Sequence, residues 1–97
     1  MSNGRSEKRI AKTVRVEVCL VDDPTLKERT LTENVSAHGL RVLTHRSLRP
    51  KQQVVVISSN DGVWLRAEVV YSHHAEGNRF AVGLELSGRA ASWASAY

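Results

Sequence analysis

The chain of 97 residues, 41% of them hydrophobic, has the length of one small domain built around one modest core. Aromatic residues make up only 5%, and no apolar run approaches the roughly 20 residues of a membrane span, which argues against a stacking platform for single-stranded nucleic acid and against a transmembrane helix. The sole cysteine, Cys19, excludes an internal disulfide, and the polar N-terminus MSNGRSEKR lacks the apolar segment of a secretory signal, so we expect a cytoplasmic protein.

The formal net charge of +4 is concentrated at the N-terminus. All of it arises within the first fifteen residues, where Glu7 opposes five basic residues, Arg5, Lys8, Arg9, Lys12 and Arg15. The remainder carries nine basic and nine acidic residues, unlike a domain that follows a long phosphate backbone. The basic segment is therefore either a solvated tail or an arm that binds a small anion or a surface.

Alternating apolar residues and turn signals predict six strands in chain order. They cover residues 13–21, 25–35, 40–44, 53–58, 63–72 and 79–86. Asn60, Asp61 and Gly62 form a strong hairpin signal between the fourth and fifth strands. No segment before Ser87 shows a sustained period of 3.6 residues, so the predicted fold is all-β, a small six-stranded antiparallel barrel, closed or split.

The domain organisation follows from these elements. Residues 1–12 form a flexible basic arm, residues 13–87 form the barrel, and residues 88–97 form an alanine-rich tail. Ten residues are marginal for an isolated helix, so a short helix in the tail depends on Trp93 packing back onto the barrel.

The polar residues form no grouping typical of catalysis or of a metal site. His73 and His74 are adjacent, would point apart on a strand, and are assigned to the loop 73–78. Cys19 is isolated on the polar face of the first strand, and the glycines do not fall at the spacings of phosphate-binding loops. We therefore expect no enzymatic activity, no metal and no cofactor.

Two short motifs remain, Arg5-Ser-Glu-Lys-Arg9 and Asn34-Val-Ser36-Ala-His-Gly39. An RxxxR motif in an N-terminal segment, followed some two dozen residues later by (D/N)xSxxG in an all-β domain, resembles the PilZ domain family, whose members bind cyclic di-GMP. The resemblance continues through GLRVLT, VVVIS, AEVVYS and NRFAVGLEL and covers nearly the whole chain. By itself NVSAHG also fits an ordinary turn between two strands, so the resemblance depends on both motifs together.

The resemblance implies a role for each motif residue. Arg5 and Arg9 present planar forks of donors that suit a phosphate or the O6/N7 edge of guanine, and a guanidinium also stacks on a purine. Asn34 offers a carbonyl to the N–H groups of guanine, where an aspartate would offer two acceptors, and Ser36 adds a hydroxyl. Gly39 serves either a turn with positive φ or the close approach of a ring or phosphate to the backbone.

The resemblance also implies a mechanism. Cyclic di-GMP, a bacterial second messenger, would order the arm across the barrel, with Lys8 and Lys12 as supporting charge and Arg15 only on the outer face of the first strand. The changed surface would then face a downstream protein partner or a second copy, so the protein is expected as a monomer or a homodimer. Family members bind one ligand or an intercalated pair, and an arginine just before RxxxR tends to accompany the pair. Gly4 stands there, which favours one ligand.

Two other functions remain open. A degenerate PilZ-like adaptor would keep the barrel and bind protein without nucleotide, although such adaptors generally lose the arginine pair or the SxxG motif. A small OB-like barrel would bind RNA or single-stranded DNA, but its sheet would need basic and aromatic residues, and Trp64, Tyr71 and Phe80 are few. We expect no DNA, RNA or membrane partner.

Overall fold

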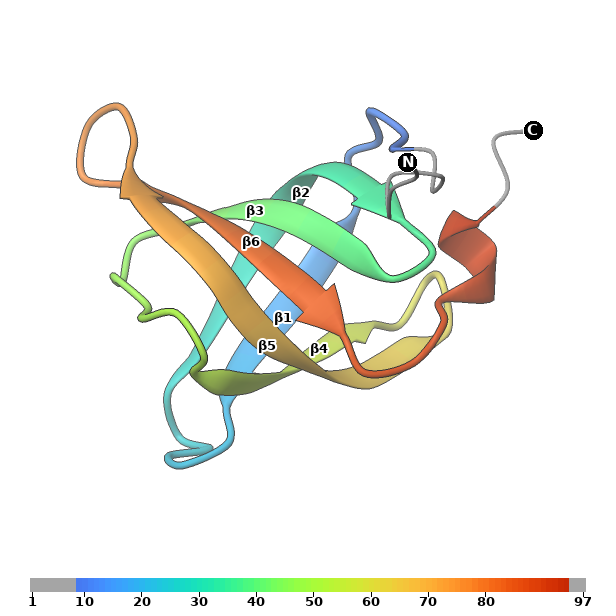
Figure 1. The fold of residues 1–97 in the computed structure, drawn as a ribbon, viewed down its shortest axis with the longest axis horizontal. Helices are drawn as coiled ribbons and strands as arrows, with labels where there is room; N and C mark the ends of the chain where they lie inside the picture. Colours follow the sequence, from blue (N-terminus) through green and yellow to red (C-terminus); the bar gives the residue numbers. More distant parts are fainter. Residues whose placement is uncertain (1–8, 95–97) are drawn as a thin grey trace, which may run out of the picture.

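The computed structural model describes residues 9–94 as a closed barrel of six strands followed by one short helical turn (Figure 1). The elements are β1 (Arg15–Leu20), β2 (Lys27–Ser36), β3 (Gly39–Thr44), β4 (Gln53–Ser58), β5 (Val63–His74), β6 (Phe80–Leu86) and the 3-10 helix η2 (Ala91–Trp93). The order around the barrel is β1-β2-β3-β6-β5-β4, and β1 closes it by pairing with β4. Every neighbouring pair is antiparallel, so the predicted all-β barrel is confirmed.

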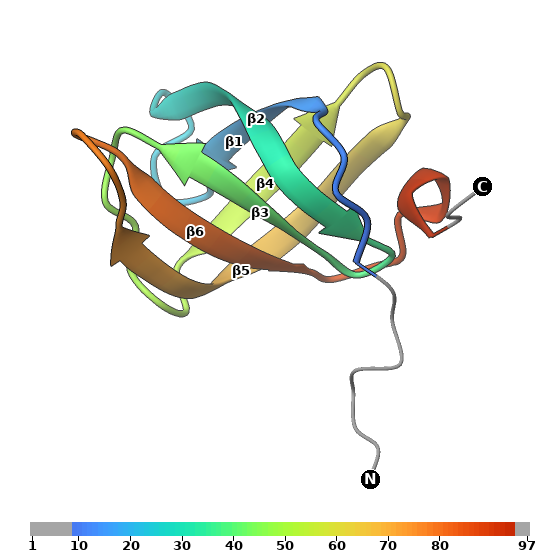
Figure 2. The ribbon, with the colours of Figure 1, turned by 90° about the horizontal axis from the view of Figure 1, so that it is seen from above.

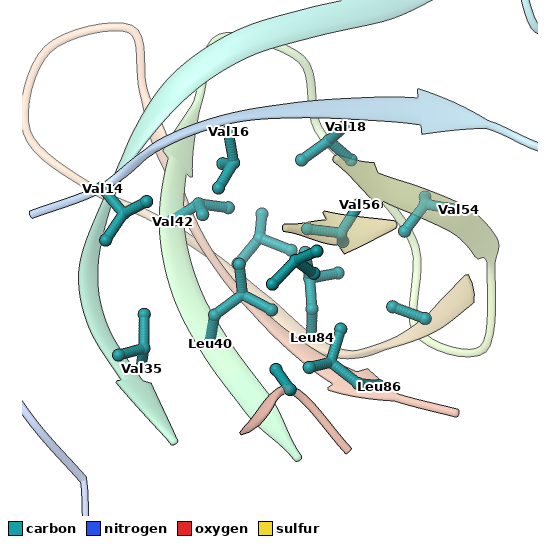
Figure 3. Packing of buried hydrophobic residues seen from close by; sticks show 14 of the residues in the cluster. Val14, Val16, Val18, Val35, Leu40, Val42, Val54, Val56, Leu84 and Leu86 are labelled. Carbon is teal, nitrogen blue, oxygen red and sulfur yellow. The ribbon is translucent and has the colours of Figure 1, made fainter. Parts of the chain in front are cut away.

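The hydrophobic core fills the interior of the barrel (Figure 3). The apolar alternation of the first strand places Val16 and Val18 inside, together with Val56 on the neighbouring strand β4 and Leu40 on β3. Valine dominates because its branched side chain is stiff, favours extended backbone and is small enough for a narrow barrel.

The hairpin predicted at Asn60, Asp61 and Gly62 is confirmed, because β4 and β5 pair antiparallel up to Ser58 and Val63. Gly62 adopts a φ of +69°, which a residue without a Cβ does at low cost. The loop predicted for residues 73–78 is wrong in its first two residues, because β5 extends through His73 and His74. These pair with β6, and their rings pack on Tyr71 and Phe80 at centroid distances of 4.8 and 5.5 Å.

Two bulges interrupt the alternation of side chains between the inside and the outside of the barrel. One lies in β2 between Thr32 and Asn34, and the other lies in β5 between Val69 and Tyr71. In β2 the extra residue lets both Thr32 and Val35 point inward although they are three positions apart. A bulge shifts the phase of a strand by one residue, so Asn34 moves to the outer face.

The C-terminal segment closes one end of the barrel. It forms a single 3-10 turn, and Trp93 is fully buried, so this tryptophan does pack back onto the barrel. The indole Nε1 donates to Asp61 Oδ2 at 2.6 Å, which satisfies the only polar atom of the ring. Across residues 9–94, no helix is long and apolar enough to cross a membrane.

We predict that Trp93→Ala lowers the free energy of unfolding by about 3–5 kcal/mol, because it empties a large buried site and leaves Asp61 without its indole partner. The matched control is Trp64→Ala, since Trp64 is 75% exposed, and it should change stability by less than about 0.5 kcal/mol. Urea unfolding followed by circular dichroism measures both. Similar losses for the two variants would contradict the assigned role of Trp93.

Candidate functional site

The base of the N-terminal arm lies along the second half of β2 (Figure 2). Ile10 and Val35 exchange two backbone hydrogen bonds, Ile10 N–H to Val35 O at 2.8 Å and Val35 N–H to Ile10 O at 2.9 Å. The buried Thr32 hydroxyl accepts from Val14 N–H at 2.9 Å and donates to Lys12 O at 2.6 Å. These contacts hold the segment against β2, so residues 9–12 of the predicted flexible arm have a defined place on the barrel.

The two sequence motifs meet at Arg9. Its Nη1 donates to Asn34 Oδ1 at 2.6 Å across 25 residues of sequence. Its Nη2 lies 3.8 Å from the position that a Cβ on Gly39 would occupy. The guanidinium therefore lies over the turn between β2 and β3. Arg5, the other predicted arginine, lies outside the described residues.

Ser36 is the last residue of β2 and pairs with Gly39 across the turn to β3. Its side chain is 3% exposed, and its Oγ donates to Gly39 O at 3.4 Å. The C-terminal segment supports the same turn, because Leu86 N–H donates to His38 O at 2.8 Å and Ala90 N–H donates to Ala37 O at 2.7 Å. Backbone hydrogen bonds thus fix the turn, and the Ser36 hydroxyl adds a contact across it.

Gly39 is required for space and not for a left-handed backbone. The expectation of a positive φ is wrong, because the described glycines with positive φ are Gly62 and Gly77. A Cβ on Gly39 would lie 3.0 Å from the Leu84 carbonyl oxygen, which is closer than side chains normally come to backbone. The pairing of β3 with β6 places this carbonyl there, so a side chain at position 39 would have to displace it. The close approach of a ring or phosphate to Gly39 stays a prediction.

The other basic residues near the arm have different surroundings. Lys12 Nζ lies 3.8 Å from Asp61 Oδ2, the carboxylate that also accepts from Trp93. Arg15 is exposed on the outer face of β1 opposite Leu31, as the alternation predicts. Lys12 therefore connects the arm to the hairpin between β4 and β5.

The sequence motifs do not include one arginine that lies beside Asn34 in the structure. Arg41 on β3 is the direct cross-strand partner of Asn34. Its Nε donates to Glu33 Oε1 at 2.7 Å and its Nη1 to Tyr71 Oη at 3.2 Å. The bonds to Glu33 and then to Tyr71 raise the pKa of Arg41 above its ordinary value. The available signal was the broken alternation at TENV and VVYS, which indicates the two bulges.

One hollow of the surface is not lined by the motif residues Arg9 and Asn34, and no metal site was found in the described part of the chain. A surface groove of about 530 Å³ runs over β1, β2 and β4, and its lining includes Arg15, Arg29 and Ile57 but neither Arg9 nor Asn34. Within residues 9–94, no group of three or more His, Cys, Asp or Glu side chains is arranged to hold a metal ion.

Comparison with known proteins identifies the family and agrees with the fold. The model of the PilZ domain family matches residues 3–92. No curated protein matches the chain. Among solved structures, the inhibitor of motility (MotI/DgrA) of Bacillus subtilis is similar with a TM-score of 0.70 and 19% sequence identity, over 92% of this chain and 44% of that chain. The chain thus spans less than half of that protein, and the likeness shows a shared fold. Because the family model matches nearly the whole sequence, the chain belongs to the PilZ domain family.

Proposed function

We propose that this domain is a receptor for cyclic di-GMP that signals by ordering its N-terminal arm. PilZ domains are binding and signalling domains that act as cyclic di-GMP receptors or as adaptors. The observation that carries the proposal is the contact of Arg9 Nη1 with Asn34 Oδ1 at 2.6 Å, because it joins the RxxxR and NxSxxG motifs at one surface. The proposal assigns the ligand to Arg5, Arg9, Asn34, Ser36 and Gly39.

Binding exchanges one partner of Asn34 for another. In the empty site the Asn34 carbonyl accepts from Arg9, and this is the oxygen expected to accept from the N1–H or N2–H of guanine. Arg9 then turns to a phosphate or to the O6/N7 edge of a base, where its planar fork makes two parallel bonds. Asparagine favours this exchange, because an aspartate would hold Arg9 in a charge-assisted pair.

The arm transmits binding to a neighbouring surface. Its base is tied to β2 at Ile10, and Lys12 lies beside Asp61, which in turn holds the buried Trp93. Residues ordered by the ligand would therefore lie against a fixed support at the end of the barrel. We propose that a downstream protein, or a second copy of the domain, binds the surface formed in this way in the bacterial cytoplasm.

A nucleotide-free adaptor is the second candidate. Ser36 is 3% exposed and the Asn34 carbonyl already has a donor, so both motif residues also serve the empty structure. In an adaptor, these contacts would only hold the arm and the turn in place on the barrel. Titration with the nucleotide separates the two functions.

We predict that isothermal titration calorimetry detects one cyclic di-GMP per chain. Arg9→Ala should lower the affinity about tenfold to a hundredfold, because a charge-assisted hydrogen bond contributes about 1.5–3 kcal/mol. Ser36→Ala should lower it about three- to tenfold through the loosened turn. The matched control is Arg15→Ala, an exposed arginine on the outer face of β1, which should bind like the unmodified protein.

The absence of heat with the unmodified protein would remove the receptor function and leave the adaptor. Binding that survives both Arg9→Ala and Ser36→Ala would keep the function and refute the assigned site. An equal loss in Arg15→Ala would mean that Arg9 acts only through its charge.

We predict that cyclic di-GMP slows tryptic cleavage after Arg5 and Lys8 by about tenfold or more, because proteolysis requires a segment that is released from the surface. Mass spectrometry of a digestion time course measures the rate at each bond. Ser36→Ala, with its lower affinity, should regain the fast rate at the same ligand concentration. Cleavage unaffected by saturating ligand would refute ordering of the arm while leaving binding intact.

A further inference from the structure

Four residues form one row across the outer face of the barrel. Asn34 on β2 is paired with Arg41 on β3, Arg41 with Gly83 on β6, and Gly83 with Tyr71 on β5. Neighbouring strands lie about 4.8 Å apart, and directly paired residues point to the same side of a sheet. The row therefore extends the candidate site from Arg9 and Asn34 across three further strands.

Both ends of this row are set by the bulges. Asn34 and Tyr71 are each the first paired residue after the shift in register on β2 and β5. Bulges commonly re-aim a side chain beside a functional site. Two independent bulges thus bring a polar and an aromatic side chain to one face, on either side of Arg41.

The centre of the row is shaped to hold Arg41 in one position. Gly83 has no Cβ, and the Tyr71 ring occupies that space, since an added Cβ would lie 2.2 Å from its Cε2 atom. The phenol therefore reaches Arg41, whose Nη1 donates to it at 3.2 Å, and Glu33 accepts from Nε at 2.7 Å. Three of the five guanidinium N–H donors remain, on a side chain that is 38% exposed.

The surroundings of Arg41 favour a base over a phosphate. Glu33 balances its positive charge, so the pair offers little net attraction to an anion, unlike Arg9, which contacts a neutral amide. Guanine O6 and N7 are neutral acceptors that match the remaining donors. The O6/N7 edge adjoins the N1/N2 edge of the same base, so the neighbouring residues Asn34 and Arg41 can hold one guanine between them.

We propose that Arg41 is a further ligand-binding residue of this site, that it donates to O6 and N7 of the guanine held by Asn34, and that Tyr71 is the positioning residue that fixes it. This inference rests on the proposed binding of cyclic di-GMP. It makes the barrel supply a rigid donor for the base, while the arm supplies arginines for the rest of the ligand.

The test is a double cycle between protein and ligand. Calorimetry compares the unmodified domain with Arg41→Ala, each titrated with cyclic di-GMP and with its 7-deazaguanine analogue, which lacks N7. We expect the unmodified domain to lose about tenfold in affinity with the analogue and Arg41→Ala to lose about tenfold with cyclic di-GMP. Arg41→Ala should then bind both ligands equally.

The matched control is Arg29→Ala, because Arg29 Nε also contacts a glutamate, Glu17 Oε2 at 2.9 Å, on the outer face of β1 and β2. It should leave both affinities unchanged. Tyr71→Phe keeps the ring and removes the hydroxyl, and it should reduce the penalty for the missing N7 by about threefold. Thermal unfolding checks that each variant is folded.

Two results would overturn this inference. One is an Arg41→Ala variant that binds cyclic di-GMP as tightly as the unmodified domain does. The other is an Arg41→Ala variant that, relative to the unmodified domain, loses the same factor in affinity for cyclic di-GMP and for the analogue. If Arg9→Ala and Ser36→Ala still weaken binding in that case, the proposed function stands without it. If the unmodified domain binds no cyclic di-GMP, both proposals fall together.

Discussion

Closure of the barrel is the constraint on which the rest of the structure depends. The pairing of β1 with β4 leaves no free edge between the strands, so each side chain on them must point either into a narrow interior or outward. Valine fills the interior, and an additional residue in a strand can be accommodated only as a bulge. The bulge in β2 keeps both Thr32 and Val35 inside, and the outward position of Asn34 is its consequence. Tyr71 is likewise the first paired residue after the bulge in β5.

The contact that joins the two motifs is easy to exchange. Arg9 bonds to a neutral amide at the surface, where a hydrogen bond contributes only about 1–2 kcal/mol. The turn beneath it is firm, because the strands and the C-terminal segment hold both of its sides. In the proposed receptor, the ligand would exchange this one side-chain contact and leave the barrel as it is.

Much of the fold was predictable from local pattern, whereas the site was predictable only in part. Alternating residues and the Asn60-Asp61-Gly62 turn locate the strands, because these signals act within a few residues. The meeting of Arg9 with Asn34 was accessible through the family resemblance. Arg41 was not, because its importance arises from register across four strands, and register depends on bulges that a single sequence indicates weakly. The positive φ expected at Gly39 failed for a similar reason, since the crowding there comes from β6, far along the chain.

The Thr32 hydroxyl lies at the boundary between the barrel and the base of the N-terminal arm, residues 9–12. It gives the backbone at Lys12 and Val14 a hydrogen-bond partner from inside the protein. Of the described residues before Lys12, Ile10 makes two backbone hydrogen bonds to β2 and Arg9 makes a side-chain contact. Releasing two backbone hydrogen bonds costs about 1–3 kcal/mol, a fraction of the stability of a small domain. This segment can therefore open as a local unit while the core stays folded, and in the proposed receptor the position of Thr32 would set how much of the chain a ligand can order.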